Sequence, residues 1–156
     1  MADQPLPLSV WPTAQQPASA QRTGWYLPGS TAHPAKMLPA IARHAITAYS
    51  QVGELVVDPM CGIGTTLVEA TRLGRDAVGV ELEPRWADLA RANLAHARTL
   101  GATGTGRVVT GDARQLLELV GPELTGRVAL VVTSPPYGSS VHGQVTAKST
   151  HALNRA

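Results

Sequence analysis

The chain has 156 residues, a formal net charge of +2, 44% hydrophobic and only 15% charged residues. This length limits it to one domain, and the composition supports a buried core. It shows no basic stripe of the kind typical of a dedicated DNA-binding module. Its single cysteine excludes an internal disulfide and a multi-cysteine metal site, and its five histidines form no ligand pattern. We therefore predict no metal.

The N-terminus lacks the basic, apolar and small-residue progression of a signal peptide. No apolar run approaches the ~20 residues that span a bilayer. We therefore expect a soluble, cytoplasmic protein with no membrane partner.

Residues 1–32 are predicted to form an irregular N-terminal arm. Prolines interrupt it repeatedly, and neither helical nor strand periodicity survives between them. Trp11, Trp25 and Tyr26 are the residues of this arm that could dock on the rest of the protein.

Strands and helices are predicted to alternate in the next part of the chain. Short apolar runs, two of which end in an acid, are typical of buried parallel strands. These predicted strands cover residues 54–57, 76–81, 107–110 and 127–132. Apolar residues at helical spacing indicate helices before and between them. These predicted helices cover residues 37–49, 65–73, 84–97 and 113–120.

This alternation indicates an α/β fold with a partial doubly wound parallel sheet and right-handed crossovers. In such sheets, ligands bind beyond the carboxyl ends of the strands. Asp58, Glu81, Asp112 and Ser134 all stand at such ends. We therefore expect one binding site there.

The loop from Asp58 to Thr66 reads DPMCGIGTT. Glycines at 62 and 64 allow a tight turn and let a ligand approach without a Cβ in the way. A dinucleotide site would need a third glycine where Leu67 stands, so NAD is not predicted. Two glycines alone would also fit a plain tight turn. Asp58 before them and Glu81 at the next strand end favour a nucleoside cofactor.

Two acids suit parts of such a cofactor. A carboxylate at Glu81 can accept from both hydroxyls of a ribose because it only accepts hydrogen bonds. Asp112 could accept from an adenine amino group or cap the helix that starts at Ala113, and the two roles are compatible.

Ser134, Pro135, Pro136 and Tyr137 follow the last predicted strand as SPPY. The prolines fix φ and lack N–H groups, which leaves carbonyls free to accept from an amino group. Ser134 adds an acceptor, and Tyr137 offers a ring face to a planar base. We predict that these four are the catalytic residues, orienting an exocyclic amino nitrogen for methyl transfer. Cys61 lies away from them, so we interpret it as a small filler and not as the nucleophile of a carbon methyltransferase.

These motifs resemble those of the S-adenosylmethionine (SAM)-dependent N-4/N-6 DNA amino-methyltransferases of the S-P-P-Y type. Residues 58–66 are similar to the family's cofactor motif, and 134–137 to its catalytic motif. HPAKM at 33–37 is similar to the H-P-x-K segment that closes over the cofactor. The resemblance implies a Rossmann-like class I SAM-methyltransferase domain at 33–140 and a flexible tail at 141–156.

The resemblance also implies roles for individual residues. The loop that starts at Asp58 would hold the methionine part of SAM, Glu81 the ribose and Asp112 the adenine. Ser134, Pro135 and Tyr137 would grip a flipped base. The implied cofactor-binding residues are His33, Lys36, Asp58, Pro59, Met60, Cys61, Gly62, Gly64, Thr65, Thr66, Glu81 and Asp112.

The implied activity is methylation of cytosine-N4 or adenine-N6 in DNA, as in restriction–modification systems. The motif order is also similar to that of tRNA guanine-N2 methyltransferases. Those tend to have a D-P-P-Y clamp and an upstream RNA-binding domain, which residues 1–32 do not contain, so RNA is the second expectation. Only 19 residues follow Tyr137, too few for the distal strands of the family. A third expectation is therefore a truncated, incomplete domain, a SAM-binding remnant that needs a second chain.

Overall fold

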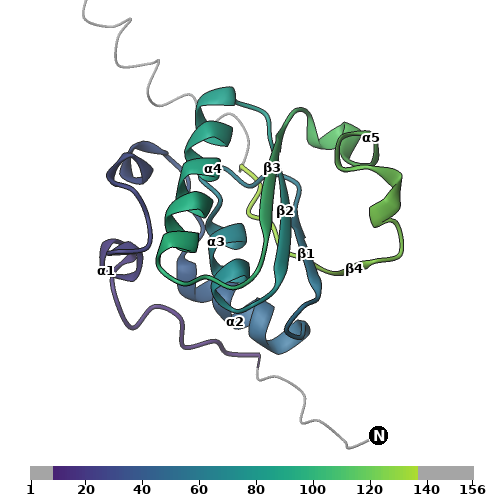
Figure 1. Ribbon diagram of the computed structural model, residues 1–156. Helices are drawn as coiled ribbons and strands as arrows, with labels where there is room; N and C mark the ends of the chain where they lie inside the picture. Colours follow the sequence, from purple (N-terminus) through teal and green to yellow (C-terminus); the bar gives the residue numbers. More distant parts are fainter. Residues whose placement is uncertain (1–8, 137–156) are drawn as a thin grey trace, which may run out of the picture.

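The computed structural model describes residues 9–136, and its four strands form one parallel sheet (Figure 1). The strands are β1 (Leu55–Asp58), β2 (Asp76–Glu81), β3 (Gly106–Thr110) and β4 (Val128–Val131). Their order across the sheet is β3-β2-β1-β4. The chain winds outward from β1 to β3 and returns to the other side of β1. This reversal confirms the predicted partial doubly wound, Rossmann-like α/β fold.

Helices cover both faces of the sheet (Figure 1). The first face carries α2 (Pro39–Tyr49), α3 (Thr65–Arg72) and α4 (Pro84–Thr99), and the second carries α5 (Leu116–Val120). Short 3-10 helices, η2 (Ala113–Gln115) and η3 (Pro122–Leu124), flank α5. The predicted helix at 113–120 is thus divided in two, and α2 begins two residues later than predicted, at a proline.

The apolar runs of the central strands are buried on both sides. Val56 and Ala77 pack with the helices of the first face, whereas Val57, Val78 and Val80 pack with the α5 side. Burial on both faces explains why these strands are continuously apolar and do not alternate. The two cores fix the strands of the sheet relative to one another. The residues that follow the strands therefore lie along the same edge.

The N-terminal segment, residues 9–38, differs from the irregular arm that the prolines predicted for residues 1–32. It contains α1 (Ala18–Arg22) and the 3-10 helix η1 (Pro28–Ala32). Pro17 and Pro28 stand at the starts of these two helices, where a proline is compatible with a helix. The segment docks through Tyr26, which is buried in a cluster with Ile63, Val68 and Trp86. The predicted tail at 141–156 lies outside the described residues.

Among residues 9–136, no helix is both long and apolar enough to cross a bilayer. The longest helix, α4, has 16 residues and carries charged side chains along its length. Its inner face is apolar around Ala87 and Ala90, and this face packs on the sheet.

Candidate functional site

A cavity of about 230 Å³ opens at the carboxyl ends of the strands. Residues that end or follow each strand line it: Asp58 for β1, Glu81 for β2, Asp112 for β3 and Ser134 for β4. The chain reverses direction between β1 and β4, and ligands of doubly wound sheets bind at such a point. The structure therefore brings the predicted strand-end residues to one site.

Most of the predicted site residues line this cavity. They are His33, Lys36, Asp58, Pro59, Met60, Cys61, Gly62, Thr65, Thr66, Glu81, Asp112, Ser134 and Pro136. The cavity also includes residues that were not predicted, among them Leu82 and Glu83. Both follow Glu81 within two residues, and that proximity was the available signal.

Gly64 and Pro135 are not part of the cavity lining. Gly64 has a φ of +82°, and a Cβ on it would lie 3.1 Å from the Cβ of Ala90 on α4. Its missing side chain therefore lets α3 and α4 approach closely, and its expected contact with a ligand stays a prediction. Tyr137 lies outside the described residues.

Asp58 ends β1 and is buried, with an exposed fraction of 3%. The N–H of Met60 donates to its Oδ1 at 3.1 Å. Burial raises the pKa of Asp58 above its ordinary value, and the hydrogen bond from Met60 opposes that rise. A cationic ligand group would favour the ionised form, so this acid suits an ammonium.

Glu81 ties the glycine loop to the end of β2. Its Oε2 accepts from the N–H of Gly62 at 2.8 Å, and its Oε1 accepts from the N–H of Glu83 at 2.8 Å. Each carboxylate oxygen can accept a second hydrogen bond. Glu81 thus has two remaining acceptor positions beside the cavity, the number that two ribose hydroxyls require.

Asp112 caps η2, as one of its two predicted roles requires. Its Oδ1 accepts from the N–H of Arg114 at 2.9 Å, and the guanidinium of Arg114 lies 2.9 Å from Oδ2. These hydrogen bonds from Arg114 lower the pKa of Asp112 to about 2. The carboxylate is therefore ionised at the rim of the cavity, and its predicted contact with adenine stays a prediction.

The HPAKM segment forms another wall. The ring of His33 packs edge-on against Trp86, with centroids 4.7 Å apart, and its Nε2 lies 3.2 Å from where a Cβ on Gly62 would be. Lys36 donates from Nζ to the carbonyl of Thr31 at 3.1 Å and to the carbonyl of His33. Burial lowers the pKa of both His33 and Lys36. This segment thus contacts the glycine loop directly.

Cys61 belongs to the core cluster on the first face of the sheet. Burial raises the pKa of its thiol well above the ordinary value. A thiol that stays protonated is a poor nucleophile. Its environment is that of a small apolar filler, as the sequence analysis proposed.

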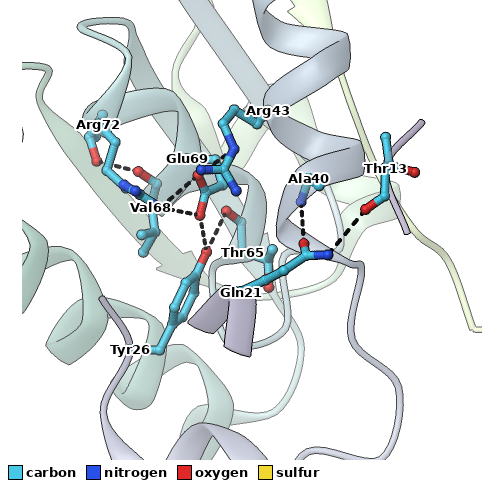
Figure 2. A network of polar contacts seen from close by, with 10 residues as sticks. Thr13, Gln21, Tyr26, Ala40, Arg43, Thr65, Val68, Glu69 and Arg72 are labelled. Carbon is cyan, nitrogen blue, oxygen red and sulfur yellow. Dashed lines mark hydrogen bonds and ion pairs between the residues drawn. The ribbon is translucent and has the colours of Figure 1, made fainter. Parts of the chain in front are cut away.

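A polar network joins the N-terminal segment to α2 and α3 (Figure 2). Its centre is the fully buried Glu69 of α3, which accepts from the hydroxyl of Tyr26 at 2.9 Å and from Arg72 at 2.9 Å. Arg43 of α2 lies 3.7 Å from the same carboxylate. The Tyr26 hydroxyl also lies 3.4 Å from the carbonyl of Thr65, the first residue of α3. The network thus ties the N-terminal segment to the helix that borders the cavity.

The cavity fits a ligand with a cationic group, a diol and an apolar part. Asp58 and Glu81 supply carboxylates, and the half-exposed Met60 and exposed Leu82 supply apolar surface at the rim. The buried hydroxyl oxygens of Thr65 and Thr66, two residues of the lining, have no hydrogen-bond partner in the described structure. Within the described ranges, no group of acids, histidines and cysteine could hold a metal ion.

A family model described as DNA methylase matches residues 2–92. The chain belongs to this family, the N6/N4 amino-methyltransferases. The match includes the N-terminal segment, the loop at 58–66 and Glu81, and it ends before Ser134. SAM is the methyl donor of the family.

Relatives that methylate different molecules are similar in sequence to part of this chain. A tRNA (guanine(10)-N2)-dimethyltransferase from Methanothermobacter thermautotrophicus is 35% identical over 109 residues, which are 69% of this chain and 30% of that protein. A 4-amino-L-phenylalanine/4-methylamino-L-phenylalanine methyltransferase from Streptomyces pristinaespiralis is 43% identical over 102 residues, which are 63% of this chain and 31% of that protein. The chain thus spans about a third of the length of these relatives.

Among solved structures, an RNA methyltransferase from Salinibacter ruber in complex with S-adenosyl-L-homocysteine aligns with a TM-score of 0.45 and 18% identity. The alignment covers 64% of this chain and 76% of that one. The Rossmann-like fold follows from the strand order and the family match.

Proposed function

We propose that this chain binds SAM in the cavity and serves a methyltransferase whose acceptor is an amino nitrogen on an aromatic ring. The observation that carries the proposal is the convergence of Asp58, Glu81 and Ser134 on one cavity. SAM supplies an electrophilic methyl group when bound. Methyl transfer to nitrogen needs no covalent enzyme intermediate, so the task of the protein is orientation and charge stabilisation.

Each polar residue has a role in this proposal. The buried carboxylate of Asp58 pairs with the ammonium of the methionine part of SAM. The hydroxyl of Thr65 forms a hydrogen bond with the polar end of that methionine part. Glu81 accepts from the ribose hydroxyls with its two remaining acceptor positions, and Asp112, which lines the cavity, accepts from the adenine amino group. The carbonyls and hydroxyl around Ser134 and Pro136 accept hydrogen bonds from the amino group that receives the methyl group. These bonds would direct its lone pair at the methyl group.

The first candidate acceptor is a DNA base, cytosine at N4 or adenine at N6. The family match supports it, because the matching model describes DNA methylases. Guanine-N2 of tRNA is the alternative that the archaeal relative supports. In all three bases the methyl group goes to an exocyclic amino nitrogen. This agrees with the SPPY motif, whose carbonyls and hydroxyl can accept hydrogen bonds from an amino group.

A small aromatic amine is a second candidate. The Streptomyces relative, at 43% identity, acts on an amino acid whose amino group is on a phenyl ring. In addition, two exposed cations are already paired with acids of the cavity lining: Arg85 with Glu83 at 2.9 Å, and Arg114 with Asp112. Cations neutralised in this way are less suited to bind phosphates, from which nucleic-acid binding draws much of its affinity.

A labelled-methyl transfer assay distinguishes these acceptors. The full chain is incubated with methyl-labelled SAM and, separately, with DNA, tRNA or 4-amino-L-phenylalanine. We expect label in DNA, and we expect Tyr137→Ala to abolish transfer while SAM binding is retained. Label only in tRNA or only in the amino acid would reassign the acceptor. SAM binding without transfer to any of them would favour a subunit that needs a second chain.

A further inference from the structure

Asn93 is a fully buried polar residue in the middle of α4. Its Nδ2 donates to the carbonyl of Ile63 at 2.9 Å and to Oγ of Ser30 at 3.0 Å. Its Oδ1 accepts from the N–H of Leu27 at 2.9 Å and lies 3.3 Å from Oγ of Ser30. One side chain thus joins α4, the glycine loop and the N-terminal segment.

The position of Ile63 makes this contact informative. Ile63 stands between Gly62 and Gly64, which have φ values of +53° and +82°. Glycines in such conformations lose more entropy on ordering than other residues, so a loop of this kind needs external contacts to stay in one shape. The Asn93 amide supplies one such contact to the central peptide of the loop. The Ile63 side chain is also buried, in the cluster that contains Tyr26 and Trp86.

We propose that Asn93 is a positioning residue that holds the glycine loop in its ligand-binding shape by joining it to residues 27–30. The inference rests on the proposed SAM site and adds a residue that does not line the cavity. A carboxamide suits the position because it combines two donors with an acceptor that can take two bonds. Holding the loop before the ligand arrives lowers the ordering cost of binding.

The helix itself offers a matched control. His96 lies three residues further along α4, and its Nε2 is 2.8 Å from the carbonyl of Gly24. It ties α4 to the same N-terminal segment without a contact to the glycine loop in the described structure. A residue that merely anchors the segment should therefore behave like His96 when it is substituted.

Asn93→Asp tests the proposal because the two side chains have nearly the same shape. The carboxyl can still accept from Leu27, but it has at most one donor when protonated and none when ionised, so it cannot replace both bonds that the amide donates to Ile63 and Ser30. Binding of S-adenosylhomocysteine is measured by calorimetry at a temperature where each variant is folded. Hydrogen exchange of the Gly64 amide, which donates to the carbonyl of Cys61 at 2.8 Å, reports on the loop without a ligand.

For Asn93→Asp we expect about tenfold weaker binding and about tenfold faster exchange at Gly64. For His96→Ala we expect both quantities to stay within roughly twofold of the wild type, whatever its loss of thermal stability. Equal effects of the two substitutions would overturn the positioning role. A loss of thermal stability in Asn93→Asp with unchanged binding and exchange would overturn it as well.

Hydrogen exchange of the wild type covers the case in which Asn93→Asp does not fold. The amides of Leu27 and Gly64 should then open together, with the same dependence on denaturant, because Asn93 links their segments. Independent opening would contradict the proposal. If the wild type fails to bind S-adenosylhomocysteine, the proposed function fails. The exchange of these two amides still decides the role of Asn93.

Discussion

Gly62 and Gly64 belong to the same turn but have different tasks. At Gly62 a side chain would meet His33, whereas at Gly64 it would meet Ala90 of α4. The spacing of the glycines predicts the turn, and Asp58 and Glu81 around it predict the ligand. The spacing does not reveal which glycine faces a helix, since that depends on how α3 packs on α4.

Gly64→Ala should therefore destabilise the protein more than Gly53→Ala does. Both glycines have φ near +82°, at +82° and +83°, but a Cβ at Gly53 would meet nothing within 4 Å. The shared backbone strain costs about 1–2 kcal/mol. The contact with Ala90 adds roughly 1–3 kcal/mol of overpacking in the Gly64 variant. Urea denaturation of the two variants measures the difference, and equal losses would contradict the packing role.

Among the acids, sequence reasoning was most successful where a strand ends. Asp58 and Glu81 reach the cavity because parallel strands bring their carboxyl ends to one edge. For Asp112 the sequence left two roles open, and the structure shows the capping one. Its partner Arg114 is two residues away, so this pairing is local and could have been predicted from the sequence.

At the scale of elements, the N-terminal segment is the main difference from expectation. Arg22 donates to the carbonyl of Met37 at 2.6 Å, and Arg72 of α3 stacks 3.8 Å from the centre of the Trp25 ring. Such contacts join residues far apart in sequence, and neither propensity nor periodicity can predict them. Similarly, Glu69 has the sequence signature of an ordinary helix-surface acid, yet Tyr26 covers it from 43 residues away.

Tyr26→Phe tests how firmly this segment is held. Removing the hydroxyl leaves the buried carboxylate of Glu69 without one of its hydrogen bonds, so we expect a loss of about 1.5–3 kcal/mol in the free energy of unfolding. Tyr49→Phe is the control, because the Tyr49 ring is 50% exposed, and it should change stability by less than about 0.5 kcal/mol.

Urea denaturation measures both variants, and limited proteolysis reports on residues 9–38. Faster cleavage within that segment should accompany the lost stability in Tyr26→Phe. If Tyr26→Phe and Tyr49→Phe have the same stability and the same cleavage pattern, the network in Figure 2 does not anchor the segment.

At the scale of the whole molecule, the alternation of predicted strands and helices along the chain was sufficient to predict the sheet. The four predicted apolar runs correspond to the four parallel strands, with every boundary within one residue, because buried strands and amphipathic helices have distinct periods. The docking of the N-terminal segment, which builds one wall of the cavity, was not predictable in the same way. It depends on the side chains of Tyr26, Glu69 and Asn93 meeting in three dimensions.

β4 has the least covered position in the described sheet. It pairs with β1 on one side, and Val131 is 56% exposed. Within residues 9–136 no further strand pairs with its outer edge. The expectation of an incomplete domain concerns this edge, and it stays a prediction.

Calorimetric titration with SAM tests the central claim most directly, because the site is defined by its cofactor. We predict saturable binding by the wild type, binding weakened about tenfold or more in Glu81→Gln, and unchanged binding in the surface control Asp88→Asn. Glu81→Gln puts an amide where two backbone N–H groups and a diol all need an acceptor. No binding by a folded wild type, or equal affinity in Glu81→Gln, would contradict the assignment of this cavity to SAM.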